Sequence, residues 1–336
     1  MQGETSFLYF IVMYSKQSNI MIKNRKLAVI RFLLFWTLSA LIIPLSAQEA
    51  EYPDYRLMID SIDYRISDFF RHNKQITIEQ LQTDVTNPMN SENLVYVKQL
   101  PARRKKTLTG NQLYKLCKKS TLMVGVKEKK GYSRFLATAV ALTDDGICAT
   151  NYHVLAEVIL SGLLNGQFYQ NFLYFVMQAD GSVYPLKKVL AADPVNDFAI
   201  FQVETGKDKL YPMPLGNPAL EGDDIYCLSH PQGRLFYLTK GIVGRNHAQV
   251  NRGNLQVRYE MQITADYAVG SSGGPIIDNC GNLVGLVSST HSIYPDMHST
   301  KNFQMSIKNA VPVKLLNNCI VLINNKKYLN EKVDNF

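Results

Sequence analysis

The sequence predicts an all-β fold for residues 111–325, and three observations support this prediction. About twelve apolar runs of strand length, such as TLMVGV, FAIFQV and LVGLVSS, are rich in β-branched and aromatic residues. Turn-forming segments such as TDDG, ADGS and NCGN separate these runs. Apolar residues at helical spacing are rare between them. Many short strands with frequent turns are typical of a β-barrel or a β-sandwich, and the length suits one such domain.

Short helices are expected at the two ends of this domain. NQLYKLCKKS, residues 111–120, predicts a helix before the first strand. KNAVPVKLLNN, residues 308–318, predicts a short closing helix. The other runs predicted as strands are LATAVAL, ICAT, YFVMQ, VYPLKKVLA, DIYCLS, FYLTKGIVG, LQVRYEMQIT and PIID.

Residues 48–110 are expected to form an N-terminal extension with one helix, and residues 326–336 a C-terminal tail. Met58, Ile62 and Ile66 recur at helical spacing in DYRLMIDSIDYRISDFF, which predicts an amphipathic helix. The extension ends in PARRKK. Its four consecutive basic residues fit either a processing site that releases a pro-segment or a solvated linker, and we favour the linker.

Residues 1–47 have the pattern of a secretory signal peptide. A basic head, MIKNRK, begins at Met21, and an apolar run extends from Phe32 to Leu45. Small residues before Gln48 offer a cleavage site. The run is shorter than the roughly 18 residues expected of a membrane span, so a membrane is a partner only if the segment stays uncleaved. The pattern favours translation from Met21 and export to the periplasm or the extracellular space.

The charge of the mature chain argues against nucleic acid as a partner. The full chain has a formal charge of +8, and loss of residues 1–47 removes five basic residues and one acidic residue, which leaves +4. The cysteines lack C-x-x-C spacing, so no zinc site is expected, and no cofactor is predicted. Their number is odd and their pairing stays open: Cys117, Cys148, Cys227, Cys280 and Cys319.

The segment GSSGGP, residues 270–275, suggests a nucleophile in a tight loop. It formally fits G-x-S-x-G, the nucleophile elbow of α/β-hydrolases, which requires a helix directly after the serine. Here Ser272 is followed by two glycines, a proline and a strand-like run, so the elbow is excluded by its context.

A second interpretation pairs Ser272 with a base and an orienting acid. A serine hydroxyl is a weak nucleophile until a base such as histidine removes its proton, and a carboxylate holds that histidine in place. His153 follows the run ICAT and Asp197 precedes FAIFQV. The order His153, Asp197, Ser272, with intervals of 44 and 75 residues, is that of chymotrypsin.

Several segments together resemble the trypsin-like serine peptidases, and among them the HtrA (Deg-type) branch. TDDGICATNYHV resembles the segment around the family's catalytic histidine, DPVNDFAIFQV that around its aspartate, and GSSGGPIIDNCGNLVGLVSS that around its serine. GDDIYCLSHPQG resembles a glycine- and proline-containing turn of the same branch. The similarity covers roughly residues 120–320.

This resemblance implies a fold, an activity and the residues that perform it. It implies two six-stranded antiparallel β-barrels with the site between them, and hydrolysis of polypeptides through an acyl-enzyme. Ser272 would be the nucleophile, His153 the base and Asp197 its orienting acid. The backbone N–H groups of Gly270 and Ser272 would form the oxyanion hole. Ser271 is expected to be a loop residue without chemistry, and His230 a turn residue.

The sequence departs from the family in ways that leave the substrate open. Candidates for the substrate pocket are Asp266, Val287 and Ser288. In trypsin, an aspartate at the same offset before the catalytic serine as Asp266 selects substrates with Lys or Arg. The loop here resembles another branch, so this offset alone does not establish that preference. Ala137-Thr138-Ala139 replaces a Gly-x-Gly turn, and sixteen residues after Ile320 are too few for a PDZ domain.

The alternative to a peptidase is a catalytically silent binding module that keeps the same fold. The complete set of His153, Asp197 and Ser272 favours the enzyme. The oligomeric state stays open.

Overall fold

A computed structural model describes most of the β domain and parts of the segments around it. The described residues are 21, 23, 25–32, 50, 52–72, 80, 82–84, 94–128, 133–161, 163–164, 167–168, 172–295 and 300–323. Residues 54–336 form one compact unit, separate from residues 1–53.

Six strands in the first half of the β domain close into a ring. Every neighbouring pair is antiparallel, in the order β2-β3-β4-β9-β8-β7. The strands are β2 (Thr121–Glu128), β3 (Ser133–Ala141), β4 (Ile147–Thr150), β7 (Phe172–Met177), β8 (Val183–Asp193) and β9 (Phe198–Val203). Helix α5 (Tyr152–Ser161) and the short hairpin of β5 (Leu163–Leu164) and β6 (Gln167–Phe168) lie between β4 and β7 in the chain.

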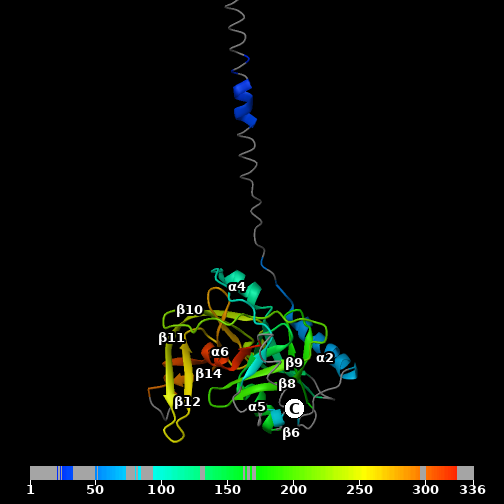
Figure 1. Cartoon of the computed structure of the whole chain (residues 1–336), viewed down its shortest axis with the longest axis vertical. Helices are drawn as coiled ribbons and strands as arrows, with labels where there is room; N and C mark the ends of the chain where they lie inside the picture. The colour runs from blue at the N-terminus through cyan, green and yellow to red at the C-terminus, as the bar shows by residue number, and fades with distance from the viewer. Residues whose placement is uncertain are drawn as a thin grey trace, which may run out of the picture. The chain divides into compact units, whose positions relative to one another are not determined.

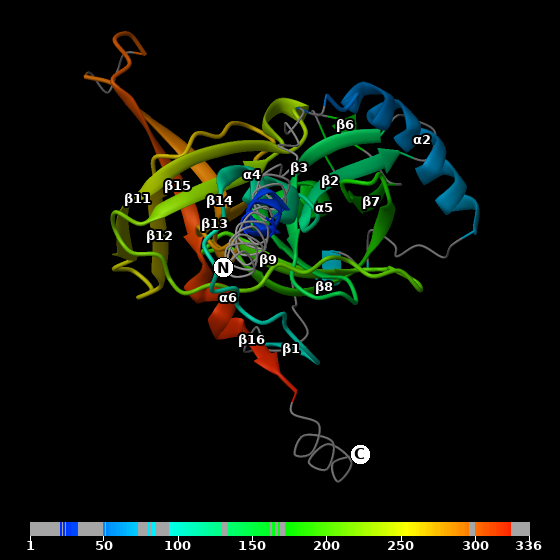
Figure 2. The same ribbon diagram turned by 90° about the horizontal axis from the view of Figure 1, so that it is seen from above.

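The other six strands form a closed barrel beside this ring (Figures 1 and 2). The antiparallel order is β10-β11-β12-β15-β14-β13. The strands are β10 (Asp224–Ser229), β11 (Tyr237–Val250), β12 (Val257–Ile263), β13 (Pro275–Ile277), β14 (Leu283–Ile293) and β15 (Met305–Pro312). A 3₁₀ turn, η1 (Pro231–Gly233), connects β10 to β11, and α6 (Val313–Cys319) follows β15.

Side chains that alternate between the two faces of the strands form the apolar clusters of the domain. In β2, Leu122, Val124 and Val126 belong to the cluster inside the first ring, whereas Met123 between them belongs to a second cluster outside it. A two-residue period places successive side chains on opposite faces of a strand. Both faces of β2 are therefore buried, which explains its continuous apolar run. A third cluster fills the barrel and includes Ile225, Met261 and Val287.

The N-terminal extension packs against this domain. Helix α2 (Tyr55–His72) lies along the outside of the first ring, as Figure 2 shows. Ile62 and Ile66 are at most 1% exposed and join the outer apolar cluster. Asp63 accepts hydrogen bonds from the Lys127 ammonium at 2.9 Å and the Ser133 N–H at 2.8 Å. The amphipathic pattern thus directs its apolar face onto the ring.

Two more contacts hold the rest of the extension in place. β1 (Val95–Val97) pairs in parallel with β16 (Ile320–Leu322), which joins the extension to the C-terminal part of the unit. Arg104, within the basic run, donates its N–H to the Asn282 side chain at 2.7 Å and accepts from the amide of the same side chain at 3.0 Å. Helix α4 (Gly110–Cys117) then begins with a capping box formed by Thr109 and Gln112.

The prediction of a mostly β domain is confirmed, and its boundaries with helices differ in two places. Residues 308–312 belong to β15, so the closing helix α6 begins only at Val313, directly after Pro312. Proline lacks an N–H and suits the start of a helix rather than its interior. Helix α5, directly after the segment ATN, was not predicted, because VLAEVILS is a short and mostly apolar run whose pattern does not distinguish a helix from a buried strand.

The predicted signal segment lies largely outside the described residues. Residues 33–47 contain most of its apolar run and its cleavage site, and they are among the undescribed residues. Within the described residues, no helix combines the length and apolar character needed to cross a membrane.

Candidate functional site

His153 lies in the first turn of α5, where backbone N–H groups lack partners within the helix. The N–H of His153 donates to Asp197 Oδ1 at 3.1 Å. The preceding Asn151, which is fully buried, donates its side-chain amide to the Asp197 carbonyl at 2.8 Å. The Asp197 carboxylate therefore accepts one of the free N–H donors at the start of α5, and this contact fixes the position of the His153 backbone.

Asp197 lies at the end of a tight turn that precedes β9. The Asp193 carboxylate accepts the N–H groups of Val195 and Asn196, each at 2.9 Å, which closes the turn. Asp197 itself has a φ of 58°, in the left-handed region that aspartate and asparagine tolerate better than most residues. The turn aims the Asp197 side chain at α5 rather than along β9.

The carboxylate of Asp197 binds the imidazole of His153 directly. Nδ1 of His153 lies 2.9 Å from Oδ1 and 3.0 Å from Oδ2. The Asp197 side chain is 15% exposed and that of His153 is 41% exposed. Burial raises the pKa of Asp197. Hydrogen bonds from His153 and Ser288, together with the nearby His153 charge, lower this pKa by a larger amount. Its pKa is therefore below the ordinary value, and Asp197 is ionised at neutral pH.

Ser288 on β14 connects this pair to Ser272. Its hydroxyl donates to Asp197 Oδ2 at 2.6 Å, and its carbonyl accepts from the Ser272 hydroxyl at 3.4 Å. The structure thus brings His153, Asp197 and Ser272 into one hydrogen-bonded group. Within the described residues, the Ser272 hydroxyl has this contact with Ser288 and no hydrogen bond to His153.

The loop before Ser272 leaves two backbone donors unused. The loop is closed by the Ser271 N–H on the Ala268 carbonyl at 2.9 Å and the Gly273 N–H on the Val287 carbonyl at 2.9 Å. In the described part of the chain, the N–H groups of Gly270 and Ser272 donate to no protein acceptor. Two free N–H groups beside a serine hydroxyl can bind a developing negative charge.

The two serines of GSSGGP have different surroundings. Ser271 is fully buried, and its hydroxyl lies 2.9 Å from that of Ser229 at the end of β10. It also accepts the Ala268 N–H at 3.4 Å. Ser271 therefore fixes the loop to the barrel, whereas Ser272 is only partly buried and has its hydroxyl at the site.

The three residues assigned to a substrate pocket lie in three different places. The Asp266 side chain is 87% exposed, and its carboxylate lies 3.6 Å from the Lys308 ammonium. Val287 is 1% exposed and packs inside the barrel. Ser288, its neighbour on β14, points the other way and binds Asp197. This contact of Ser288 was missed from the sequence, because the pairing of β14 with β15 is irregular between Val287 and Ser289, and simple alternation does not assign a direction to Ser288.

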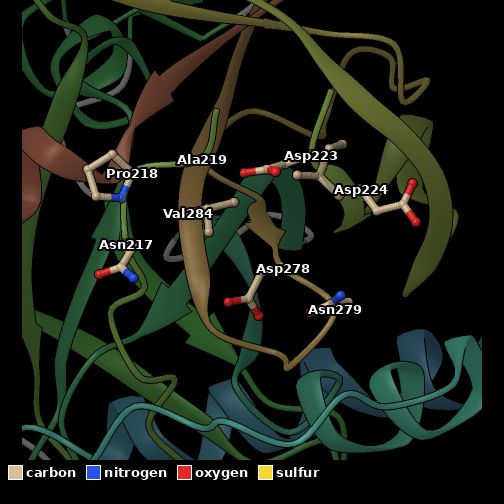
Figure 3. A pocket seen from close by; sticks show the side chains of 9 residues that line it. Asn217, Pro218, Ala219, Asp223, Asp224, Asp278, Asn279 and Val284 are labelled. Atoms are coloured by element: carbon tan, nitrogen blue, oxygen red, sulfur yellow. The ribbon is translucent and has the colours of Figure 1, made fainter. Parts of the chain in front are cut away.

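A separate pocket lies on the barrel and does not include these residues. Its volume is about 250 Å³. Figure 3 shows three carboxylates around it, from Asp223, Asp224 and Asp278. Asp224 is paired with Lys240 at 2.9 Å, and Asp278 accepts from the Asn282 amide at 2.8 Å. Among the described residues, no three His, Cys, Asp or Glu side chains are arranged to hold a metal ion.

The cysteines lie in different elements of the fold. All five are free thiols in the structure. Cys117, Cys148, Cys227 and Cys319 are buried, and burial raises the pKa of Cys117 to about 12. A thiol with such a pKa is protonated and unreactive at neutral pH.

Comparisons with known proteins find similarity to one family in the central part of the chain. Residues 137–286 match the model of the trypsin-like peptidase domain. Protease Do-like 5 of Arabidopsis thaliana, a chloroplastic protein, is 30% identical over 49% of this chain and 52% of its own length. A probable periplasmic serine endoprotease DegP-like of Brucella suis is 27% identical over 49% of this chain and 30% of its own length.

The similarity covers only part of each relative. The chain spans about half the length of Protease Do-like 5 and less than a third of the Brucella protein. Among solved structures, the crystal structure of Deg5 has a TM-score of 0.48 at 22% identity, over 62% of this chain and 90% of that chain.

The geometry of the Gly270 loop predicts the effect of adding a methyl group. Gly270 and Gly222 both have positive φ, 94° and 89°, so alanine is strained at either position. A Cβ at Gly270 would lie 2.7 Å from the His230 carbonyl oxygen, whereas Gly222 has open space. We expect Gly270→Ala to lower the free energy of unfolding by about 1–3 kcal/mol more than Gly222→Ala. Urea denaturation of the two variants measures this difference, and equal midpoints would contradict the crowding at Gly270.

Proposed function

We propose that this chain, which carries a trypsin-like peptidase domain similar to HtrA-type proteases, is an exported serine endopeptidase. The observation that carries this proposal is the hydrogen-bonded group of His153, Asp197, Ser288 and Ser272. The names of its relatives, which include serine endoproteases, support the same reaction class. Its substrates would be polypeptides.

In the proposed reaction, Ser272 attacks and His153 transfers the proton. Since Nδ1 of His153 donates to Asp197, its Nε2 carries the lone pair that accepts the hydroxyl proton of Ser272. Substrate binding would shift the Ser272 hydroxyl from the Ser288 carbonyl to Nε2, as catalytic hydrogen bonds often tighten only in the complex. Ser272 Oγ then bonds to the scissile carbonyl carbon, and the imidazolium returns the proton to the leaving amine. Water hydrolyses the resulting ester by the same transfers in reverse order.

We propose the N–H groups of Gly270 and Ser272 as the oxyanion hole. They are adjacent to the nucleophile, and neither is bound by a protein acceptor in the described residues. Fixed donors that face the developing negative charge stabilise the transition state more than the ground state. Loss of one such donor typically costs about 3 kcal/mol of barrier.

The finer architecture belongs to the same proposal. The first ring and the barrel would be the two β-barrels of a trypsin-like peptidase over residues 111–325, preceded by a signal segment 1–47 and an extension 48–110, with a tail at 326–336. Direct hydrogen bonds between the two halves support this arrangement. Thr138 on β3 donates its N–H to the Ser272 carbonyl at 2.9 Å. The periplasmic location named for the Brucella relative supports export.

A fluorophosphonate probe tests the nucleophile directly. We expect the mature chain to be labelled once, at Ser272, and Ser272→Ala to abolish both labelling and peptide hydrolysis. Ser292→Ala, which removes an exposed serine of β14, is the matched control and should keep both activities. Mass spectrometry of the labelled peptide identifies the site. An unlabelled wild-type chain, also after cleavage at Lys106, would instead favour the silent binding module.

The exposure of Asp266 predicts which substrate residues the enzyme accepts directly before the cleaved bond. A carboxylate that is 87% exposed and close to Lys308 does not form the floor of a buried acidic pocket. We therefore expect peptides with Lys or Arg at this position to be cleaved no faster than those with Val or Ala. Asp266→Asn should change kcat/KM for the basic peptides by less than about twofold, because exposed ion pairs contribute little. A strong preference for Lys or Arg that Asp266→Asn removes would contradict this.

A further inference from the structure

The His230–Gly233 turn, which follows β10, supports the Gly270 loop through hydrogen bonds. The N–H of Gln232 donates to the Val269 carbonyl at 2.6 Å, which fixes the peptide that carries the Gly270 N–H. Thr138 Oγ1 donates to the Gly270 carbonyl at 2.9 Å and accepts the His230 N–H at 3.2 Å. The peptides on both sides of Gly270 are thus held by contacts that depend on the His230–Gly233 turn.

His230 is held in turn by Phe236. The His230 side chain is buried, and its Nδ1 accepts the Phe236 N–H at 3.0 Å. The two rings pack edge to face, with their centroids 4.7 Å apart. Burial lowers the pKa of His230 to about 3, so the ring stays neutral at physiological pH and keeps Nδ1 as an acceptor. The position of Phe236 therefore sets that of His230.

Phe236 needs support of its own, since its φ is 56°. A bulky residue in this left-handed region is strained and persists only when its surroundings fix it. Its ring centroid lies 6.2 Å from that of Tyr55 and 5.0 Å from the Lys118 ammonium. Lys118 also binds the Tyr55 hydroxyl at 3.2 Å, and that hydroxyl lies 3.1 Å from the hydroxyl of Tyr114. Three rings thus surround one ammonium group, an attractive arrangement for a cation.

Tyr55 comes from a distant part of the chain. It is the first residue of α2, in the extension that precedes the β domain. A continuous series of contacts therefore runs from the extension through Lys118, Phe236 and His230 to Gly270.

We propose that Tyr55 is a positioning residue for the oxyanion hole and that the extension is an integral part of the active peptidase. This inference rests on the proposed function of Gly270. Tyr55 would keep Phe236 in its strained conformation, and Phe236 would keep the His230 turn against the Gly270 loop. The extension would then increase the rate of catalysis, in contrast to an inhibitory pro-segment, whose removal activates an enzyme.

The basic run before the β domain agrees with this role. Arg104 is bound through both its N–H and its carbonyl to Asn282, which is 1% exposed. This pairing anchors the extension next to the barrel at Arg104, while Arg103, Lys105 and Lys106 are exposed.

Kinetics of Tyr55 variants of the whole mature chain test the proposal. Tyr55→Ala removes the ring, Tyr55→Phe keeps it, and Tyr64→Ala removes a tyrosine of the same helix that is 78% exposed. Active sites are counted by titration, and we expect Tyr55→Ala to lower kcat at least about tenfold with KM nearly unchanged. The reason is that a misplaced donor reduces the stabilisation of the transition state and leaves substrate binding unchanged. Tyr55→Phe should restore most of the rate, and Tyr64→Ala should match the wild type. If Tyr55→Ala is too unstable to purify, Tyr55→Leu replaces it.

Amide NMR gives a second readout that does not depend on activity. The Gly270 signal should shift in Tyr55→Ala and stay in place in Tyr64→Ala. A wild-type rate per active site and an unshifted Gly270 signal in Tyr55→Ala would overturn this inference while the proposed function stands. If the wild type hydrolyses no peptide and binds no fluorophosphonate, the proposed function fails, and with it the catalytic role of Tyr55.

Discussion

The buried carboxylate of Asp197 is the constraint on which the site depends. An ionised carboxylate that is 15% exposed is stable only when hydrogen-bond donors surround it, and removing one partner of such a charge typically costs about 3–5 kcal/mol. The donors come from two distant parts of the chain, His153 on α5 and Ser288 on β14. Asp197 therefore joins the first ring to the barrel at the place where Ser272 is presented.

The same carboxylate links stability with chemistry. Its contact with Nδ1 fixes the tautomer of His153, which leaves Nε2 as the acceptor that a serine nucleophile requires. Its contact with Ser288 positions a carbonyl that holds the Ser272 hydroxyl. In the Gly270 loop, which hydrogen bonds connect to the His230 turn, the N–H groups of Gly270 and Ser272 donate to no protein acceptor among the described residues. In this arrangement, three parts depend on one another: the Asp197 carboxylate, the His153 imidazole and the Gly270 loop. Each of them is fixed by contacts outside the site.

Local patterns predicted the strands and α2 because their signals lie within a few residues. The spacing of Met58, Ile62 and Ile66 is enough to predict a helix, and alternating or continuous apolar runs are enough to predict strands. Pairings between distant segments could not be predicted in this way. β1 has three residues and no distinct pattern, yet it pairs with β16 more than 200 residues later in the chain. Likewise, the motifs predicted His153, Asp197 and Ser272, but the contact of Ser288 with Asp197 depends on how β14 approaches β9 across the two halves.

The most direct test of the central claim is kcat/KM of Asp197→Asn at neutral pH. An asparagine has nearly the same shape, but its amide favours the opposite tautomer of His153, so the base would present a proton to Ser272 instead of a lone pair. We expect kcat/KM to fall by roughly 10⁴, with the protein still folded by circular dichroism. A folded Asp197→Asn variant that retains kcat/KM within tenfold of the wild type would contradict the account.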